Sequence, residues 1–262
     1  MGTKLSCLLI LLNSFALAQE WTFVKKIDLG QKITSVSAAA NDKMYFGTER
    51  GNVYSLLSDG TEDTNYSSSI FQPITSLDGS NSLRVFVFYS GTGQFEFLDR
   101  FSALFRTYEL TIFGINQGEK ATIGVNQTLW FLSGTKLIQV DPVNQLVIRE
   151  EILTDSIFTE QVSDLKFRRN HLAISNPSSG IYFYNTELSN ANFLPCAGAQ
   201  NFQFVDSNII LLCGEEINNW NPISGRISNY KAPRSDFEKM LTSGNYYHFT
   251  RGSEVFIYQR NP

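Results

Sequence analysis

The sequence has few of the residues that carry most enzyme chemistry. Its 262 residues include two histidines and three cysteines, and only 18% are charged. No vicinal cysteine pair and no S-x-D-x-G-x-T-W turn occurs, and no G-x-S-x-G nucleophile motif adjoins either histidine. A histidine zinc site needs three or more ligands, usually with carboxylates among them. His171 and His248 are therefore interpreted as structural residues, and no catalytic residue is assigned.

Long apolar runs are also lacking, except at the N-terminus. In Met1 to Ala18, Lys4 precedes an apolar run from Leu5 to Leu12, and Ala16-Leu17-Ala18 has the small-x-small pattern of a leader-peptidase site. This order of features is typical of a secretory signal peptide. We expect residues 1–18 to be removed, which leaves Gln19 as the first residue of the mature chain.

The alternative for this segment is a membrane-anchoring helix. The run is too short to span a bilayer, and Asn13-Ser14 interrupts it. Lipid attachment at Cys7 is not expected, because this cysteine precedes most of the apolar run. No other run approaches membrane-spanning length. The sequence thus predicts an exported protein, periplasmic or extracellular, with no membrane span.

The charge balance is nearly neutral and slightly acidic. The formal net charge is −4 at pH 7, and aromatic residues make up 13% of the chain. Nucleic acids and anionic membranes attract basic surfaces, so neither is expected as a partner. Sparse charge together with many aromatic residues favours stacked sheets over disorder or a coiled coil.

Two cysteines, Cys196 and Cys213, lie outside the predicted leader. A pair of cysteines in an oxidising compartment is a candidate disulfide. A strand turn at Asp206-Ser207 would place Gln200 opposite Cys213, so Cys196 would be about four residues out of register. The two cysteines can then bond only if the chain bends back, and two buried free thiols are the alternative.

An Asn at a turn before an apolar strand recurs at intervals of about 40 residues. Asn tolerates the left-handed backbone conformation and bonds its own backbone, so it suits a tight turn between antiparallel strands. Fixed-period similarity of this kind indicates a repeat architecture. The six positions are Asn41, Asn81, Asn126, Asn170, Asn208 and Asn245.

Each Asn is preceded by one strand-like run and followed by two. In the first unit these runs are ITSVSA (33 to 38), KMYFGT (43 to 48) and VYSLL (53 to 57). Many runs are apolar on both faces, as expected for strands buried between neighbouring sheets. With a weaker outer strand, four short strands per repeat of about 40 residues predict a β-propeller. We therefore predict an all-β, six-bladed β-propeller that occupies residues 19–262 as a single domain.

The first strand-like segment has no hairpin partner ahead of it, and the last repeat lacks its outer strand. Trp21 to Leu29 is predicted to complete the last blade beside Val255 to Gln259, which closes the ring and removes two free sheet edges. Trp21, Phe23, Ile27 and Leu29 are expected to form its buried face. An open two-sheet sandwich is the alternative, although the even spacing argues against it.

Two segments, NDKMYFGTERGNVYSLL and KLIQVDPVNQLVI, resemble repeats of the quinoprotein-like and NHL-like β-propellers, a superfamily that includes WD-like repeats. Such repeats place a Gly-bearing hairpin before a strand that ends in Asp or Asn. The resemblance extends over all six units. It implies the fold but not an activity, because propellers host many unrelated functions.

One column of the predicted innermost strands is polar throughout. Asp164, Gln203 and Lys239 come from three consecutive repeats, so they are expected to line a wet channel, and they are the candidate residues for binding a small polar ligand there. A channel that holds only water is the alternative. The whole column consists of Ser35, Ser76, Thr122, Asp164, Gln203 and Lys239.

We expect no cofactor. Pyrroloquinoline quinone (PQQ) enzymes often carry a vicinal cysteine pair, which this chain lacks. Calcium needs several converging oxygen ligands. Asp78, Asp164, Asn201 and Glu238 are near the innermost strands, although no spacing singles them out. The sequence therefore favours a non-catalytic binding or scaffold module for a protein or glycan partner. The alternative is a metal-dependent hydrolase or lactonase at the channel mouth.

Overall fold

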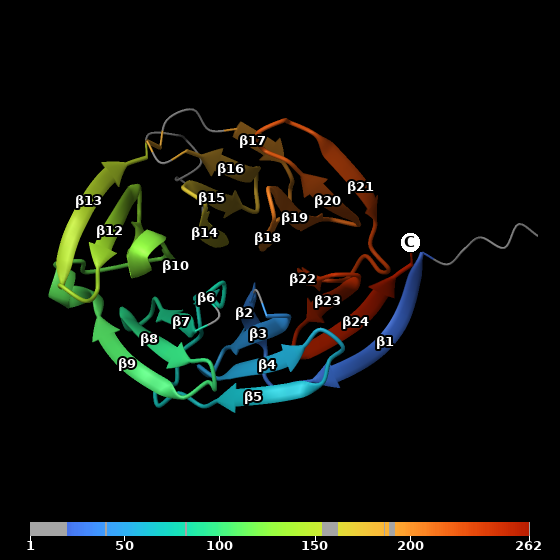
Figure 1. Cartoon of the computed structure of the whole chain (residues 1–262), viewed down its shortest axis with the longest axis horizontal. Helices are drawn as coiled ribbons and strands as arrows, with labels where there is room; N and C mark the ends of the chain where they lie inside the picture. Colours follow the sequence, from blue (N-terminus) through green and yellow to red (C-terminus); the bar gives the residue numbers. More distant parts are fainter. Residues whose placement is uncertain are drawn as a thin grey trace, which may run out of the picture.

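The computed structural model describes residues 20–39, 41–81, 83–153, 162–185, 187–188 and 192–261, so the predicted leader lies outside the described residues. Within these ranges the strands form six four-stranded antiparallel sheets. The sheets are arranged as blades of a ring around a central axis (Figure 1). The predicted six-bladed propeller is confirmed, and the sandwich alternative is excluded.

We number the blades I to VI in the chain order of their innermost strands, and each strand list runs from the axis outward. Blades I to III consist of β2 (Ile33–Ala38), β3 (Lys43–Thr48), β4 (Val53–Leu57) and β5 (Glu62–Tyr66); β6 (Ser76–Asp78), β7 (Arg84–Tyr89), β8 (Gln94–Asp99) and β9 (Leu104–Glu109); and β10 (Lys120–Ile123), β11 (Leu129–Ser133), β12 (Lys136–Asp141) and β13 (Leu146–Ile152). Blades IV to VI consist of β14 (Asp164–Arg168), β15 (His171–Asn176), β16 (Gly180–Tyr184) and β17 (Asn192–Pro195); β18 (Phe202–Val205), β19 (Asn208–Cys213), β20 (Glu216–Trp220) and β21 (Ile227–Lys231); and β22 (Lys239–Ser243), β23 (Tyr246–Arg251), β24 (Glu254–Arg260) and β1 (Trp21–Asp28). Two short 3-10 helices, η1 (Leu110–Phe113) and η2 (Val125–Gln127), lie in the connections.

Blade VI combines the two ends of the described chain. Strand β1 pairs antiparallel with β24, with Trp21 opposite Arg260 and Ile27 opposite Val255. The two strands lie side by side at the rim of the ring (Figure 1). The predicted closure of the last blade by the N-terminal strand is therefore confirmed.

The predicted buried face of β1 is wrong in part. Trp21 is 7% exposed, but Phe23 is 53% exposed, and only Ile27 and Leu29 of the other expected residues pack partly against the core. A register shift between Phe23 and Lys25 interrupts the regular alternation. Because the bulge is set by the pairing with β24, the sequence of β1 alone did not reveal it.

The core of the ring lies between blades. Six clusters of buried apolar residues occur in the described residues, and each joins two neighbouring blades. Between blades II and III, for example, Phe86 and Phe95 pack against Phe131. Second strands such as β3 and β7 are therefore buried on both faces, which explains why their sequences do not alternate. Residues with high strand propensity, such as Val, Ile, Phe and Tyr, fill these positions.

The faces of the ring differ in the connections they carry. Innermost strands run from one face, here called the entry face, to the other, here called the exit face. The entry face carries the crossovers between blades and the turns between second and third strands. The exit face carries the turns after the first and third strands of each blade. At the first of these turns the predicted Asn takes the left-handed conformation in blades III and IV (φ 52° at Asn126, 63° at Asn170), whereas Asp42, Asp206 and Gly244 take it in blades I, V and VI.

Cys196 and Cys213 are joined by a disulfide, with their Cα atoms 5.4 Å apart. Residue pairing between β18 and β19 places Phe202 opposite Leu211, which leaves Cys196 out of register as expected. The chain bends back at Gly198, which has a positive φ of 86° and whose N–H donates to Pro177 O (2.7 Å). The bridge therefore ties the crossover that leaves blade IV to the second strand of blade V.

Replacing Cys196 and Cys213 together with Ser is expected to lower the free energy of unfolding by about 3 kcal/mol. The bridge spans 17 residues, and closing a loop of that size restricts the unfolded chain by about this amount. Urea denaturation of the wild type with and without reductant measures the effect. The double variant is the control, because it has no disulfide for the reductant to break. Equal midpoints for oxidised and reduced wild type would contradict the prediction.

Candidate functional site

Polar side chains of the innermost strands mostly bond to the neighbouring blade. Each reaches a backbone group of the adjacent innermost strand or its turn, so these bonds hold one blade against the next. Such interblade bonds are accepted by Ser37 from Gly79 N (2.9 Å), Ser76 from Ala121 N (2.9 Å), Asp78 from Ile123 N (3.2 Å), Thr122 from Phe167 N (3.2 Å), Asp164 from Phe202 N (3.3 Å), Asn201 from Met240 N (3.0 Å) and Gln203 from Thr242 N (2.8 Å).

The predicted all-polar channel lining is therefore wrong for part of the column. Ser35, Ser76 and Thr122 are buried rather than in contact with a wet channel. The alignment was also two residues out of place in blade III and in blade V, where Asn201 accepts from Met240 N as Asp164 accepts from Phe202 N. Lys120 lies opposite Leu132 in blade III, and Asp164 lies opposite Ser175 in blade IV. In each blade the N–H of the residue before it, Glu119 or Ser163, donates to the carbonyl of that opposite residue. Lys120, not Thr122, is thus the equivalent of Asp164 and Lys239.

The three predicted ligand-binding residues do not meet at one point. Gln203 lines a cavity at the exit mouth, whereas Lys239 lines one at the entry mouth. Asp164 is not among the residues that line either cavity, and its carboxylate is 3.0 Å from Lys166 Nζ. Gln203 also donates its amide N–H to Thr242 O (2.8 Å), so both ends of its amide are engaged by blade VI.

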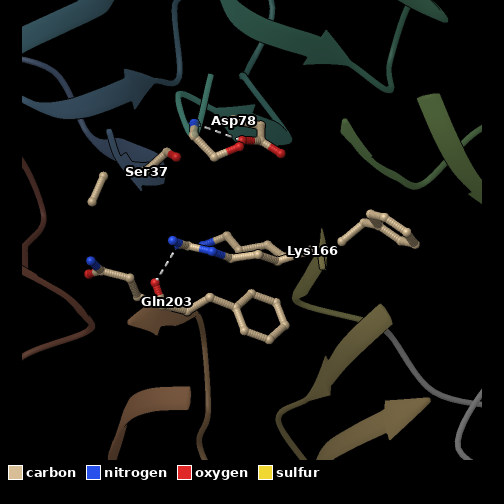
Figure 2. A pocket seen from close by; sticks show the side chains of 9 residues that line it. Ser37, Asp78, Lys166 and Gln203 are labelled. Carbon is tan, nitrogen blue, oxygen red and sulfur yellow. Dashed lines mark hydrogen bonds between the residues drawn. The ribbon is translucent and has the colours of Figure 1, made fainter. Parts of the chain in front are cut away.

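The cavity at the exit mouth is small. The Lys166 side chain extends into the space between Ser37 and Asp78 on one side and Gln203 on the other (Figure 2). Lys166 Nζ donates to Phe202 O (2.5 Å), and Arg168 beside it donates to Phe204 O (2.9 Å). These side chains leave a volume of about 30 Å³, which is room for a water molecule but not for an organic substrate.

The cavity at the entry mouth is larger, with a volume of about 360 Å³. Its lining contains two ammonium groups, those of Lys120 and Lys239, together with hydroxyl and amide side chains. Lys120 Nζ donates to Thr75 O (2.9 Å). Burial lowers the pKa of both ammonium groups, and the charge of Asp164 acts in the opposite direction on each. Lys120 is not among the predicted site residues, because nothing in its sequence context distinguishes it from a surface lysine.

Both histidines contact aromatic rings. His171 stacks on Phe183 with ring centres 4.7 Å apart, and His248 has no exposed surface. Burial lowers the pKa of His248 to about 4, although the Leu57 and Ser58 backbone and the Asp59 carboxylate favour its charged form. Neither histidine lines the cavity at either mouth.

The carboxylates and amides considered for calcium are engaged separately. Asp78 accepts from Thr122 Oγ1 (2.9 Å), and Glu238 accepts from Gly252 N (3.3 Å) on its own blade. Asp164 is paired with Lys166, and Asn201 bonds the backbone of Met240. In the part of the chain that the structure describes, no three His, Cys, Asp or Glu side chains gather in a way that could hold a metal ion. The same residues include no helix long and apolar enough to cross a membrane.

Comparison with known proteins identifies the fold alone. No protein-family model and no curated protein matches the chain. Among solved structures, the WD40 domain of Pan2 from Neurospora crassa superimposes with a TM-score of 0.62 at 10% identity, over 92% of this chain and 96% of that domain. A catalytically inactive histidine-to-alanine variant of virginiamycin B lyase from Staphylococcus aureus, solved with quinupristin, gives 0.65 at 12% identity, over 92% and 99%. A streptogramin B lyase gives 0.63 at 12%, over 92% and 98%. The resemblance to propeller repeats is thereby confirmed.

Proposed function

We propose that the chain is an exported, non-catalytic binding module that holds a protein partner on the exit face of the propeller. The observation that carries the proposal is a set of large apolar side chains at the tips of exit-face turns. Leu83 is 66% exposed, Phe101 64% and Val143 66%. They belong to the neighbouring blades II and III, and Val125 in blade III is also exposed.

Apolar side chains at the tips of turns lose their contact with water only when another surface covers them. Exposed apolar groups gathered on one face are typical of protein interaction sites. The face also presents arginine next to aromatic rings. Arg100 lies over the ring of Phe101 (4.6 Å), and Arg84 lies over Phe105 (4.7 Å) while it bonds Gln127 of blade III (2.7 Å). Arginine and aromatic residues are enriched in the centres of protein interfaces.

A protein partner fits this surface better than a glycan. Three of the four side chains are aliphatic, and aliphatic groups suit the apolar patches of other proteins. Sugar rings pack against aromatic faces, of which this set offers only Phe101. The proposal includes no reaction at the axis, since Asp78, Asp164 and Gln203 are bonded to neighbouring blades. It includes no resident cofactor, so we expect calcium titrated into the protein to produce no binding heat in calorimetry.

Two features support export. The pattern of residues 1–18 is that of a cleaved leader. The Cys196–Cys213 disulfide is of the kind that persists in oxidising compartments. We therefore propose a periplasmic or extracellular location, which intact-mass analysis of the protein from its native host tests. We expect the mass of a chain that begins at Gln19. The mass of a chain that still includes Met1 would contradict export by this route.

The binding proposal is tested with one variant for each face. Phe101→Asp with Val143→Asp adds charge to the exit face, and Phe71→Asp with Ile112→Asp adds the same charge to exposed apolar residues of the entry face. Each tagged protein is used to capture partners from the secreted fraction of its host, with binding then measured on the purified partner. We expect the exit-face variant to bind at least about tenfold more weakly than wild type, a loss of about 1.4 kcal/mol or more, and the entry-face variant to bind normally. Equal binding by both variants, or loss only in the entry-face variant, would contradict the proposal, provided that both melt like wild type.

A further inference from the structure

Two lysines from opposite blades line the entry mouth of the channel. Lys120 begins the innermost strand of blade III, and Lys239 begins that of blade VI. The third and sixth blades of a six-membered ring face each other across the axis (Figure 1). Both side chains line the same cavity of about 360 Å³.

The carboxylates nearby are directed elsewhere. Asp164 is 3.0 Å from Lys166 Nζ and accepts from Phe202 N, so its charge has a partner outside the cavity. Glu119 and Glu238 precede the two lysines, but they accept from Gly134 N (3.1 Å) and Gly252 N (3.3 Å), in turns of their own blades. Among the described residues, no carboxylate oxygen lies within 4.0 Å of the ammonium group of Lys120 or Lys239.

Two half-buried positive charges in one cavity are unfavourable unless an anion accompanies them. Burial lowers the pKa of Lys120, and the charge of Lys239 lowers it further, against the opposite effect of Asp164 and Glu119. Burial and the charge of Lys32 likewise lower the pKa of Lys239, whereas the charges of Glu238 and Asp164 raise it. An anion between the ammonium groups would offset both the loss of hydration and their mutual repulsion.

We propose that the entry mouth binds a small doubly charged oxyanion, phosphate or sulfate, between the Lys120 and Lys239 ammonium groups. Lysine ammonium groups bind phosphate as point charges through charge-assisted hydrogen bonds. Ser178 and Gln200 line the same cavity and offer a hydroxyl and an amide to further oxygens. The cavity exceeds the size of one such anion, so it also accommodates the group when a larger molecule carries it. The site lies on the face opposite to the proposed protein-binding surface, so either proposal can fail without the other.

The decisive experiment compares thermal unfolding of the full chain in sodium phosphate, sodium sulfate and sodium chloride at equal ionic strength. A ligand that binds only the folded state raises the melting temperature in proportion to the logarithm of its concentration. For wild type we expect phosphate and sulfate, but not chloride, to raise it, and calorimetry to give one phosphate per chain. No excess stabilisation by phosphate or sulfate over chloride would overturn the proposal.

Lys239→Met removes one ammonium group without removing a hydrogen bond that the structure describes. Without phosphate this variant is expected to be at least as stable as wild type, because a buried charge is lost. Its phosphate affinity is expected to fall at least about tenfold, whereas Lys239→Arg, which keeps the charge, retains binding. Lys136→Met is the matched control on the exposed surface of blade III and is expected to bind like wild type. Unchanged affinity in Lys239→Met, or an equal loss in Lys136→Met, would overturn the proposal.

Titration with O-phosphoserine beside inorganic phosphate distinguishes the two sources of the group. Tighter binding of the monoester, by about tenfold or more, assigns the site to a phosphate carried by a larger molecule. Equal or weaker binding of the monoester assigns it to the free anion. Lys239→Met is expected to weaken both ligands alike, and a monoester whose affinity is insensitive to this substitution would contradict the assignment.

Discussion

Trp21→Ala is expected to lower the melting temperature by about 10 °C. Truncation of a buried Trp costs about 3–5 kcal/mol, and 1 kcal/mol corresponds to about 2–4 °C in a domain of this size. The Trp21 ring packs edge-on against Tyr247 (4.9 Å) and Phe249 (6.0 Å) of its own blade. Its Nε1–H donates to Lys231 O of blade V (2.9 Å). One side chain therefore supports both the last blade and its junction with the blade before it, and differential scanning calorimetry measures the loss.

Phe23→Ala is the matched control on the same strand. Phe23 is 53% exposed and has one ring contact, with Tyr258 (5.4 Å). We expect Phe23→Ala to lower the free energy of unfolding by less than about 1 kcal/mol. Deletion of residues 20–29 should exceed either substitution, because it also uncovers the edge of β24, and exposed edges promote association. A deletion variant that stays monomeric with an unchanged melting temperature would contradict the assigned role of β1.

Acidification from pH 6.5 to about 4 is expected to remove about 3 kcal/mol of stability through His248 alone. Its pKa is lowered from 6.5 to about 4 in the folded chain, so the unfolded chain binds the additional proton within this range. A depressed pKa means that this stability is complete above pH 6.5 and is lost as the pH falls toward 4. Each pKa unit corresponds to about 1.4 kcal/mol. Urea denaturation at intervals of half a pH unit measures the slope.

His248→Leu should flatten this pH dependence, because the leucine side chain does not titrate. Carboxylates with lowered pKa, such as Asp63 and Asp236, begin to lose their contribution below about pH 5, so the slope assigned to His248 is read between pH 6.5 and pH 5. Parallel profiles for wild type and His248→Leu would contradict the assignment.

The fold was predictable because one pattern recurs six times. The predicted bounds Lys43 to Thr48 and Val53 to Leu57 coincide with β3 and β4. Second and third strands contact neighbouring blades on both faces, so their apolar runs are continuous and their ends are marked by turn residues. Outer strands such as Leu104–Glu109 in blade II are less regular in sequence, because their exposed positions restrict sequence less.

The site was less predictable, since the innermost strands are short and polar. A strand such as Ser76–Asp78 is too short to establish its register from its own sequence. Whether Thr122 or Lys120 faces the channel depends on residue pairing with β11, which sequence spacing does not specify. The interblade bonds were missed for the same reason, because each joins a side chain to a backbone group about 40 residues away.

Pairing of β1 with β24 also determines when the ring can be completed. A bond between Arg260 and Glu20 joins residues that are 240 positions apart, whereas the other blades form from neighbouring hairpins. During synthesis from the N-terminus, blades I to V can fold in order while β1 remains unpaired. Contacts between distant parts of a chain form slowly, because loop closure must precede them. We therefore expect completion of blade VI to be the last and slowest folding step, and until then open strand edges remain available for pairing with other chains.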